Sequence, residues 1–465
     1  MFRIMLLLFA GNASNGIILL LRNLLVARLI SVEDYGIAMT FTMAVAVIEM
    51  TSAIGLQKQL IQAENGNDAY FQAALQGFQV LRGAFNFVLL LLLAGPFAEF
   101  LGVPQVTWAH QIIAIVLLMN GFLHFDADRL NRRLRFGPAM LIASVPPLVS
   151  LAVTWPLAWY FGDYRVMLWA LIAQSAAVLI ATHLVAERPY RIVFDCKVMR
   201  ESMRFGWPLL LDGLLVFMIF NGEKLIVGRT LGMENLALFT MAVTLTLTPG
   251  LVFMRIAQNF FLPQLAATRD EGSFFDMSHV TIQAHLACGG FLVLGVTLLG
   301  APFIHLALGA KYEGAVPLLA LLGVMQALYT FKGAPTVIAI TRAKTSNAMI
   351  SNLVRVAALP LTWIVAAWSG NVVTVIVIGI VAQFLSYVAS MVLLRRQVGL
   401  PLRPSLAPLL VSFAVLACVP LTLINDPVPA AVAQLCMAGL FGLSVVTMRD
   451  LRAYLGARRM IRQDD

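Results

Sequence analysis

The chain has 465 residues, of which 60% are hydrophobic and only 12% are charged, and its mean hydropathy is +0.87. A soluble globular chain is about 45–50% apolar and about 25% charged, so there are too few charges here to cover a surface that faces water. The surplus apolar surface must face hydrocarbon, which predicts an integral membrane protein and excludes the disordered and disulfide-framework classes. The formal net charge of +9 is interpreted as the basic excess of cytoplasmic loops rather than as a nucleic-acid surface.

Fourteen segments are long and apolar enough to form transmembrane helices, each of which needs about 20 such residues. The first continues well beyond the apolar core of a signal peptide and no A-x-A cleavage site follows it. We therefore expect an all-α polytopic membrane protein with about 14 transmembrane helices, near residues 4–28, 35–57, 77–96, 107–125, 138–160, 164–186, 205–228, 235–254, 279–300, 313–331, 347–367, 371–394, 405–424 and 428–447.

The basic residues are distributed unequally between the two sides of these spans. With the N-terminus in the cytoplasm, 24 of the 32 Lys and Arg residues fall on the cytoplasmic side and 4 on the other. Lys332 is assigned to the cytoplasmic side, just after the span that ends at residue 331. By the positive-inside rule this asymmetry predicts that both termini are cytoplasmic.

An internal repeat relates the two halves of the chain. Asn23–Gly36 aligns with Lys224–Ala237 at a constant offset of 201 residues, with Arg28 matching Arg229. The first span then corresponds to the seventh, and since six is even, both halves enter the membrane in the same sense, as in a parallel pseudo-two-fold repeat. The predicted organisation is a six-helix lobe at 1–187, a cytoplasmic linker at 188–204, a second six-helix lobe at 205–394, two additional helices at 395–447 and a basic cytoplasmic tail at 448–465.

Ionisable and amide side chains inside the spans are candidates for a hydrated cavity, because burying them in hydrocarbon costs several kcal/mol. The repeat superposes Arg22 on Glu223, so the polar stripes of the first and seventh spans would face each other across the axis. Arginine and lysine in such a cavity suit an anion such as phosphate. The candidate cavity residues are Asn15, Arg22 and Asn23 on the first span, Glu49 on the second, Asp212, Glu223 and Lys224 on the seventh, and Arg355 on the eleventh. Glu49 could instead be a structural partner for a neighbouring helix, and Arg82 is expected to reach toward the membrane surface.

The motifs of common enzymes are missing. No P-loop occurs, and the six histidines never take an H-x-x-x-H spacing, so neither nucleotide hydrolysis nor metal binding is expected. Asp126-Ala127-Asp128 resembles the D-x-D motif of glycosyltransferases but lies in a short loop, and we interpret it as a solvated run of charges beside Arg129 and Arg132. We expect no enzyme activity and no cofactor, with a coupling H⁺ or Na⁺ left open.

Residues 20–60 resemble one known family. The stretch Arg22-Asn-Leu-Leu-Val-Ala-Arg28, followed by Leu-Ile-Ser-Val-Glu-Asp-Tyr-Gly36 and later by Ile54-Gly55-Leu56-Gln57, resembles bacterial polysaccharide flippases of the multidrug/oligosaccharidyl-lipid/polysaccharide exporter superfamily. The spacing of Arg22 and Arg28 is similar to that of the related lipid II flippases, whose matching arginines face the substrate cavity, and the resemblance adds Arg28 to the candidates.

The resemblance implies a function and leaves alternatives. The implied function is movement of an undecaprenyl-diphosphate-linked oligosaccharide across the bacterial inner membrane by alternating access. One alternative is a multidrug or toxin cation exporter of the same superfamily, and another is a membrane enzyme of polysaccharide assembly, either a polymerase or a ligase. A scaffold for other polysaccharide assembly proteins is a third alternative.

Overall fold

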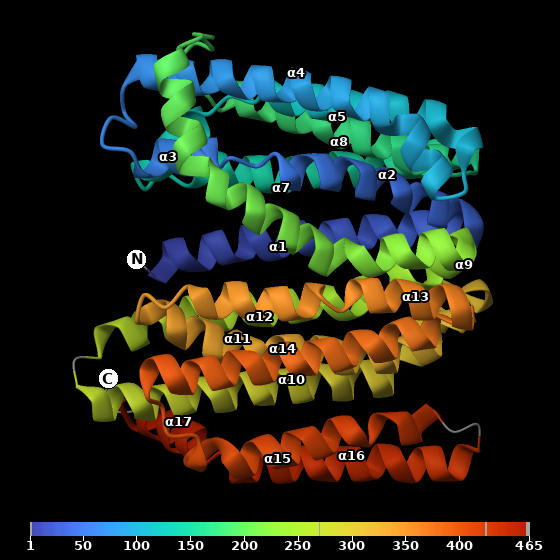
Figure 1. Ribbon diagram of the computed structural model, residues 1–465, viewed down its shortest axis with the longest axis vertical. Helices are drawn as coiled ribbons and strands as arrows, with labels where there is room; N and C mark the ends of the chain where they lie inside the picture. The colour runs from blue at the N-terminus through green and yellow to red at the C-terminus, as the bar shows by residue number, and fades with distance from the viewer. Residues whose placement is uncertain (1, 269, 424–425, 462–465) are drawn as a thin grey trace. The chain divides into compact units, whose positions relative to one another are not determined.

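The computed structural model describes residues 2–268, 270–423 and 426–461, and the side chains of these residues from 15 to 456 apart from 427. Within this part of the chain every regular element is a helix (Figure 1). Among the described residues, ten helices are long and apolar enough to cross a membrane, and two bent helix pairs, 32–62 and 104–132, raise the number to twelve if each pair is one span. The long helix α9 (Cys196–Ala267) contains two predicted spans on either side of Gly232, where φ is 86° and ψ is 177°. The predicted all-α polytopic fold is confirmed.

The chain divides into two compact units, Met1–Ala237 and Leu238–Asp465. The first contains the start of α9 and the helices α1 (Phe2–Leu29), α2 (Val32–Thr51), α3 (Leu56–Gln62), α4 (Ala69–Phe100), α5 (Thr107–Gly121), α6 (Asp126–Arg132), α7 (Gly137–Phe161) and α8 (Arg165–Leu184), with the short 3₁₀ helix η1 (Pro104–Val106). The second contains the end of α9 and the helices α10 (Glu271–Ala307), α11 (Val316–Thr341), α12 (Ser346–Val356), α13 (Leu359–Ser369), α14 (Val372–Val398), α15 (Arg403–Ala417), α16 (Pro427–Thr447) and α17 (Arg449–Ile461), with 3₁₀ helices η2 (Ala310–Ala315) and η3 (Val419–Leu423).

The pairing of helices inside each unit follows the predicted repeat. In the first unit α4 packs against α5, α5 against α8 and α7 against α8. In the second unit the helices at the corresponding places in the order pair in the same way, α10 with α11, α11 with α14 and α12 with α14. The two halves of the sequence therefore build similar bundles.

Glycines hold the start of α9 in the first unit. A Cβ on Gly206 would lie 2.4 Å from the carbonyl oxygen of Ile54, and one on Gly213 would lie 2.0 Å from that of Met50. Such backbone contact needs a residue without a side chain. The compact units accordingly divide at residue 237, whereas the linker at 188–204 and the lobe boundaries around it stay predictions.

The second unit has an apolar core that extends to the last described helix. Phe331 of α11, Tyr387 of α14 and Phe413 of α15 pack with their rings about perpendicular or tilted. Gln283 of α10 donates to Asp450 of α17 over 2.7 Å. The start of the predicted basic tail is therefore a docked helix, and residues 462–465 of that tail lie outside the described residues.

Candidate functional site

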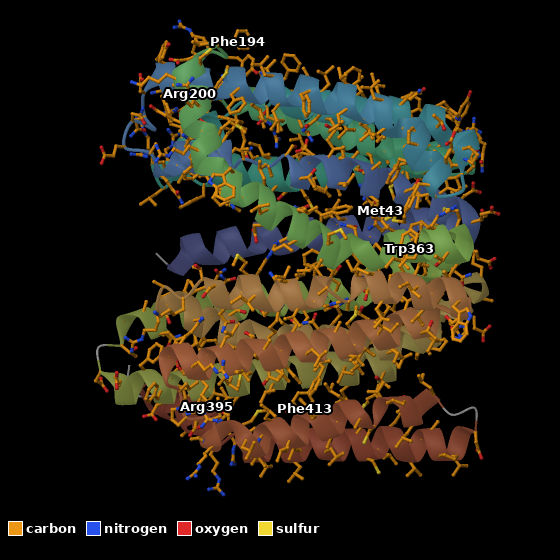
Figure 2. The ribbon with its side chains drawn as sticks, in the orientation of Figure 1. Met43, Phe194, Arg200, Trp363, Arg395 and Phe413 are labelled. Atoms are coloured by element: carbon orange, nitrogen blue, oxygen red, sulfur yellow. The ribbon has the colours of Figure 1, made fainter. Side chains whose placement is uncertain are left out.

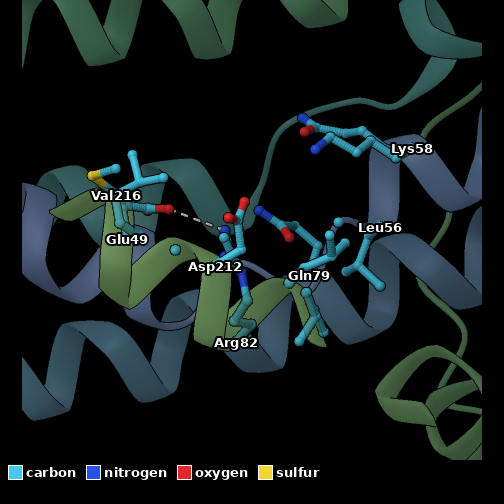
Figure 3. Close-up of a pocket in the computed structure, with 14 residues that line it drawn as sticks. Glu49, Leu56, Lys58, Gln79, Arg82, Asp212 and Val216 are labelled. Carbon is cyan, nitrogen blue, oxygen red and sulfur yellow. Dashed lines mark hydrogen bonds and ion pairs between the residues drawn. The ribbon is translucent and has the colours of Figure 1, made fainter. Parts of the chain in front are cut away.

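A cavity of about 350 Å³ opens in the first unit where α2 breaks. Residues of α2, the break, α3, α4 and α9 line this cavity, among them Glu49, Lys58, Gln79, Arg82 and Asp212. Figure 3 shows these side chains around the same space. The cavity therefore brings together two of the predicted site residues, Glu49 and Asp212.

The break in α2 has a local cause. The helix ends at Thr51 with Ser52 as its C-cap, and Gly55 has a φ of 69°, in the left-handed region that favours glycine. The next helix, α3, leaves at an angle of 44°. Carbonyl groups at the end of α2 lose their helical partners and are available to other donors.

Arg82 of α4 binds this exposed helix end. Its Nη2 lies 3.1 Å from Oε2 of Glu49, and its Nη1 donates to the carbonyl oxygen of Ser52 over 3.1 Å. The cation is thus placed at a helix C-terminus, where the helix dipole favours positive charge. Sequence reasoning left Arg82 out of the site. It interpreted Glu49 as a possible structural partner for a neighbouring helix, and in the structure Glu49 pairs with Arg82 of α4.

A hydrogen-bonded network holds Glu49 from the other side. Asn120 of α5 donates to Oε1 of Glu49 over 3.0 Å, and Gln79 of α4 donates to the carbonyl oxygen of Asn120 over 2.8 Å. The Glu49 carboxylate is 24% exposed and the Arg82 side chain 14%. The pair is positioned by three helices and still faces the cavity, where Asp212 is exposed.

Arg22 lies in a different environment of the first unit. It is only 5% exposed, and it donates to Gln174 of α8 over 2.6 Å, to Ser150 of α7 over 3.3 Å and to Asn23 over 2.9 Å. Every one of these acceptors is neutral. Arg22 therefore bonds directly to its neighbour Asn23 and also to side chains of α7 and α8 that the sequence did not identify, and a cavity role for Arg22 stays a prediction.

The remaining candidates of the first unit are placed as follows. Asn15 is half-buried, and its Oδ1 is buried without a hydrogen-bond partner among the described residues. Glu223 is 5% exposed, Lys224 is half-buried and Arg28 is exposed. None of these four lines the cavity at Glu49, and the predicted facing of Arg22 and Glu223 stays a prediction.

Arg355 belongs to a cationic cluster in the second unit. It is 3% exposed on α12, with its Nη2 3.6 Å from the sulfur of Met325. Lys332 of α11 is buried as well, with 5% of its surface exposed. It donates to Asn352 over 2.7 Å and to Ser386 over 3.3 Å. Two buried cations are thus held close to uncharged side chains.

The predicted end of the span at residue 331, which put Lys332 just outside it, is wrong. The helix α11 continues to Thr341, ten residues beyond the predicted end of the span, so Lys332 lies inside the helix. The polar Thr330, Lys332 and Thr336 hide this continuation from a hydropathy window, and Thr330 and Thr336 bond to carbonyls four residues earlier in the same helix. The apolar run that follows Lys332 was the available signal.

The interpretation of Asp126 as a solvated charge is also wrong. Asp126 is 0% exposed, and Arg129 lies 2.5 Å from its Oδ1. The carboxylate is therefore a buried, paired group of the first unit. Among the described residues there is no group of three or more His, Cys, Asp or Glu side chains that could hold a metal ion.

Comparison with known proteins identifies relatives along most of the chain. It is 23% identical over 287 residues to the teichuronic acid biosynthesis protein TuaB of Bacillus subtilis, covering 60% of this chain and 59% of the relative. It is 22% identical over 319 residues to the succinoglycan biosynthesis transport protein ExoT of Rhizobium meliloti, covering 66% and 62%. The lipopolysaccharide biosynthesis protein WzxC of Escherichia coli is 20% identical over 308 residues, covering 64% and 61%. The chain thus spans about three fifths of the length of the curated relatives it matches.

Solved structures show the same fold. The lipid II flippase MurJ in an inward closed conformation superposes with a TM-score of 0.73 at 13% identity, covering 98% of this chain and 99% of the other. An inward-facing multidrug resistance MATE family transporter of the MOP superfamily superposes with a TM-score of 0.71 at 12% identity, covering 84% and 94%.

A family model described as "Polysaccharide biosynthesis protein" matches residues 25–317. These residues are more than half of the chain and contain most of both aligned segments of the internal repeat as well as the cavity at Glu49. The chain belongs to the polysaccharide biosynthesis protein family.

Proposed function

We propose that this protein is a flippase that moves an undecaprenyl-diphosphate-linked oligosaccharide from one leaflet of the bacterial inner membrane to the other. The observation that carries the proposal is the family match over residues 25–317, in a chain built of membrane-spanning helices. The relatives named for succinoglycan transport and lipopolysaccharide biosynthesis support the same class of substrate.

The physical problem of such a transporter is the head group. A glycan with a diphosphate cannot cross hydrocarbon unaided, because each polar group would lose its hydrogen bonds to water. Buried cations beside neutral side chains can offer charge-assisted hydrogen bonds to a diphosphate. Arg22 in the first unit and Lys332 with Arg355 in the second are the side chains that we propose for this role.

The prenyl tail needs an apolar surface instead. The second unit has an apolar cavity of about 390 Å³ lined by α11, α14 and α15 with η3, and its walls include Leu321, Leu328, Phe384 and Phe413. We propose that the tail enters the protein here while the rest of it stays in lipid.

Transport would proceed by alternating access, with the substrate site exposed to each side in turn. The distribution of basic residues supports an orientation with both termini in the cytoplasm. No cofactor belongs to the proposal. If an ion drives the cycle, Glu49 and Asp212 are the carboxylates of the cavity that H⁺ or Na⁺ would meet.

A cation exporter is the second candidate function, and the two carboxylates at the cavity of the first unit favour it. Glu49 is paired with Arg82 and Lys58 also lines the cavity, so an organic cation would bind beside Asp212. The proposed flippase function places the anion at Arg22 and at Lys332 instead, so the two candidates depend on different residues.

Reconstitution in vesicles tests both. The substrate probe is the pool of lipid-linked oligosaccharides extracted from the native host, labelled on the glycan, and the readout is loss of label to a membrane-impermeant reagent. The flippase proposal expects protein-dependent exposure of label from the inner leaflet, reduced by Lys332→Met and unaffected by an excess of organic cations. Uptake of a fluorescent organic cation without movement of the labelled lipid, lost in Asp212→Asn, would replace it with the exporter.

A further inference from the structure

The segment that connects α8 to α9 is held in place at its first residues. We call residues 187–195 the strap. The backbone amides of Glu187 and Arg188 donate to Oδ2 of Asp126 over 2.8 and 3.3 Å, and the carbonyl oxygen of Arg188 lies 3.0 Å from Nε2 of His124. Nδ1 of His124 accepts from the backbone amide of Asp126. The ring proton is therefore on Nε2, which donates a hydrogen bond to the carbonyl oxygen of Arg188.

The middle of the strap lies along α4. Gln76 donates to the carbonyl oxygen of Arg191 over 2.9 Å, and the amide of Val193 donates to the carbonyl oxygen of Ala73 over 3.2 Å. A Cβ on Gly77 would lie 2.1 Å from the carbonyl oxygen of Val193, so the close contact depends on glycine at this position. These backbone polar groups of the strap are bonded to α4.

The strap ends at a helix cap that is itself anchored. Asp195 accepts from the amides of Lys197 and Val198 at the start of α9, and the hydroxyl of Tyr70 donates to its Oδ2 over 2.9 Å. These hydrogen bonds, that of Tyr70 first, lower the pKa of Asp195 below its ordinary value. The carboxylate therefore stays ionised at neutral pH and can cap the helix.

The docked strap presents large apolar and basic side chains outward. Phe194 is 62% exposed and Ile192 is 40% exposed, and Figure 2 labels Phe194 at the outer edge of the first unit, near Arg200. The exposed residues from 191 to 207 include four bases and five large apolar side chains, namely Arg191, Lys197, Arg200 and Arg204 with Ile192, Phe194, Met203, Phe205 and Trp207. Glu201 is the exposed acid among them.

The first turns of α9 continue this pattern on one helical face. Val198, Ser202 and Gly206 recur every four residues and are buried. Arg200, Arg204 and Trp207 recur at the spacing of the opposite face and are exposed. A helix with a basic and aromatic outer face suits the boundary between lipid head groups and hydrocarbon.

We infer that residues 188–207 form a membrane-interface anchor that binds anionic phospholipid head groups. The segment runs from just after one membrane-spanning helix, α8, through the first turns of the next, α9, so it begins where the chain leaves the membrane and ends where it re-enters. Ile192, Phe194 and Trp207 enter the outer hydrocarbon, and Arg191, Arg200 and Arg204 contact lipid phosphates. The ligand is chosen by charge, because each base near an anionic surface strengthens binding to it about fivefold.

The hydrogen bonds to the strap explain why such an anchor is useful. A flexible loop would lose entropy by ordering on each contact with the surface. A strap bonded to Asp126 and α4 is ordered beforehand, so a contact with lipid is transmitted to the first unit as a whole. The inference does not depend on the proposed transport function.

The test uses the full chain, with its four native cysteines replaced by serine, in vesicles of phosphatidylcholine with or without phosphatidylglycerol. A fluorophore sensitive to its environment is attached at Phe194→Cys, and quenching by brominated phosphatidylcholine, present in both kinds of vesicle, is compared with quenching by aqueous iodide. We expect lipid quenching to dominate and to increase when phosphatidylglycerol is present. Iodide quenching in both vesicles with none from brominated lipid would overturn the inference.

A second measurement avoids the substitution of Phe194. Spin-labelled phosphatidylglycerol and phosphatidylcholine compete for the surface of the unaltered chain, and Arg191→Gln, Arg200→Gln and Arg204→Gln are introduced singly. Each neutralised arginine should lower the preference for phosphatidylglycerol about two- to fivefold, the effect of one lost charge at the surface, and less at high salt. Arg165→Gln, at the other end of α8, is the matched control and should leave the preference unchanged. An equal loss in the control, or none in the three variants, would contradict binding at residues 188–207.

Discussion

Three arginines in the membrane-spanning helices have three different environments. Arg22 is bonded to neutral side chains of α7 and α8, Arg82 forms an ion pair with Glu49, and Arg355 lies against the sulfur of Met325. In sequence all three are single charges in apolar runs. Helical spacing predicts the direction in which each points but not which helix it meets, so their partners could not be assigned beforehand.

Lys332 differs most between the sequence prediction, which put it after a span, and the structure, which puts it inside α11. Its substitution is the first prediction. Lys332→Met keeps the length of the side chain and removes the charge. If the cation binds the head group, transport should fall about tenfold or more, which corresponds to one charge-assisted hydrogen bond of about 1.5 kcal/mol or more. The measurement is vesicle transport normalised to the amount of inserted protein.

The control for Lys332 is Lys344→Met. Lys344 is an exposed base in the turn between α11 and α12, and the change should leave transport as it is. A Lys332 variant that transports normally would remove this residue from the substrate site, and one that fails to insert would make it structural.

The pair of Glu49 and Arg82 leads to a second prediction. Arg82→Gln leaves Glu49 with Asn120 as a donor. Because the pair is partly exposed, the free energy of unfolding should fall by about 1–2 kcal/mol, less than for a fully buried pair. Combining it with Glu49→Gln should cost less than the sum of the two single changes. Thermal denaturation of the four proteins in detergent measures this coupling, and strictly additive losses would show that the pair does not interact.

At the scale of elements, the broken helix α2 and the start of α9 form the cavity together. Gly55 lies at the break, as the N-cap of α3, and Gly206 and Gly213 let α9 approach the break closely. The glycine positions are visible in sequence, yet the long-range contact between residues 50 and 213 is not. The cavity therefore could not be predicted from the spans.

A third prediction concerns this contact. Gly213→Ala places a Cβ against the backbone carbonyl of Met50, which cannot yield as a flexible side chain would, and overpacking of this kind should cost about 2 kcal/mol. Gly295→Ala in α10 is the matched change, since no atom lies within 4 Å of its Cβ. It should be neutral or slightly stabilising, because alanine favours a helix over glycine. Equal melting temperatures of the two variants would show that α9 is not held at Gly213.

Asp126 joins α6 to the strap, and a fourth prediction follows from it. Its carboxylate accepts from Arg129 and from two backbone amides of the strap. Asp126→Asn leaves Arg129 without this carboxylate and can turn the amide NH₂ group of asparagine toward the backbone amides. The free energy of unfolding of the first unit should therefore fall by about 3 kcal/mol.

The matched control for this prediction is Asp128→Asn, since Asp128 is a half-buried acid of the same helix α6 and the strap amides of residues 187 and 188 bond to Asp126 instead. Limited proteolysis between residues 187 and 195 reports release of the strap, which should increase for Asp126→Asn and stay unchanged for Asp128→Asn. Equal protection in both would show that Asp126 does not hold it.

At the scale of the whole molecule, the repeat is the feature that sequence and structure share. The offset of 201 residues predicts two similar halves, and the corresponding helices of each half do pair alike. Because six spans separate the aligned segments, the same repeat requires both halves to enter the membrane in the same sense.

The orientation across the membrane depends on the distribution of basic residues and leads to a final prediction. Lys311→Cys should react with an impermeant maleimide in intact cells, because Lys311 belongs to the side with few bases. Lys344→Cys, on the basic side, should react only after permeabilisation. The reverse pattern would invert the topology.

Composition, hydropathy and a local motif were enough to predict the membrane class, the approximate positions of the spans and the family resemblance. All of these act over distances of about 20–40 residues along the chain, which a single sequence displays in full. Most of the ionisable residues in the spans were found in the same way, because their rarity in apolar segments is visible without a structure.

The partners of those residues came from the packing of the helices. Packing paired Glu49 with Arg82, bonded Arg22 to α7 and α8, and buried Asp126 under the strap, and the length of α11 moved Lys332 from a loop into a helix. The pairings depend on which helices are in contact and on which residues along each helix make that contact. That choice is made by close contact between residues far apart in sequence, which hydropathy does not encode.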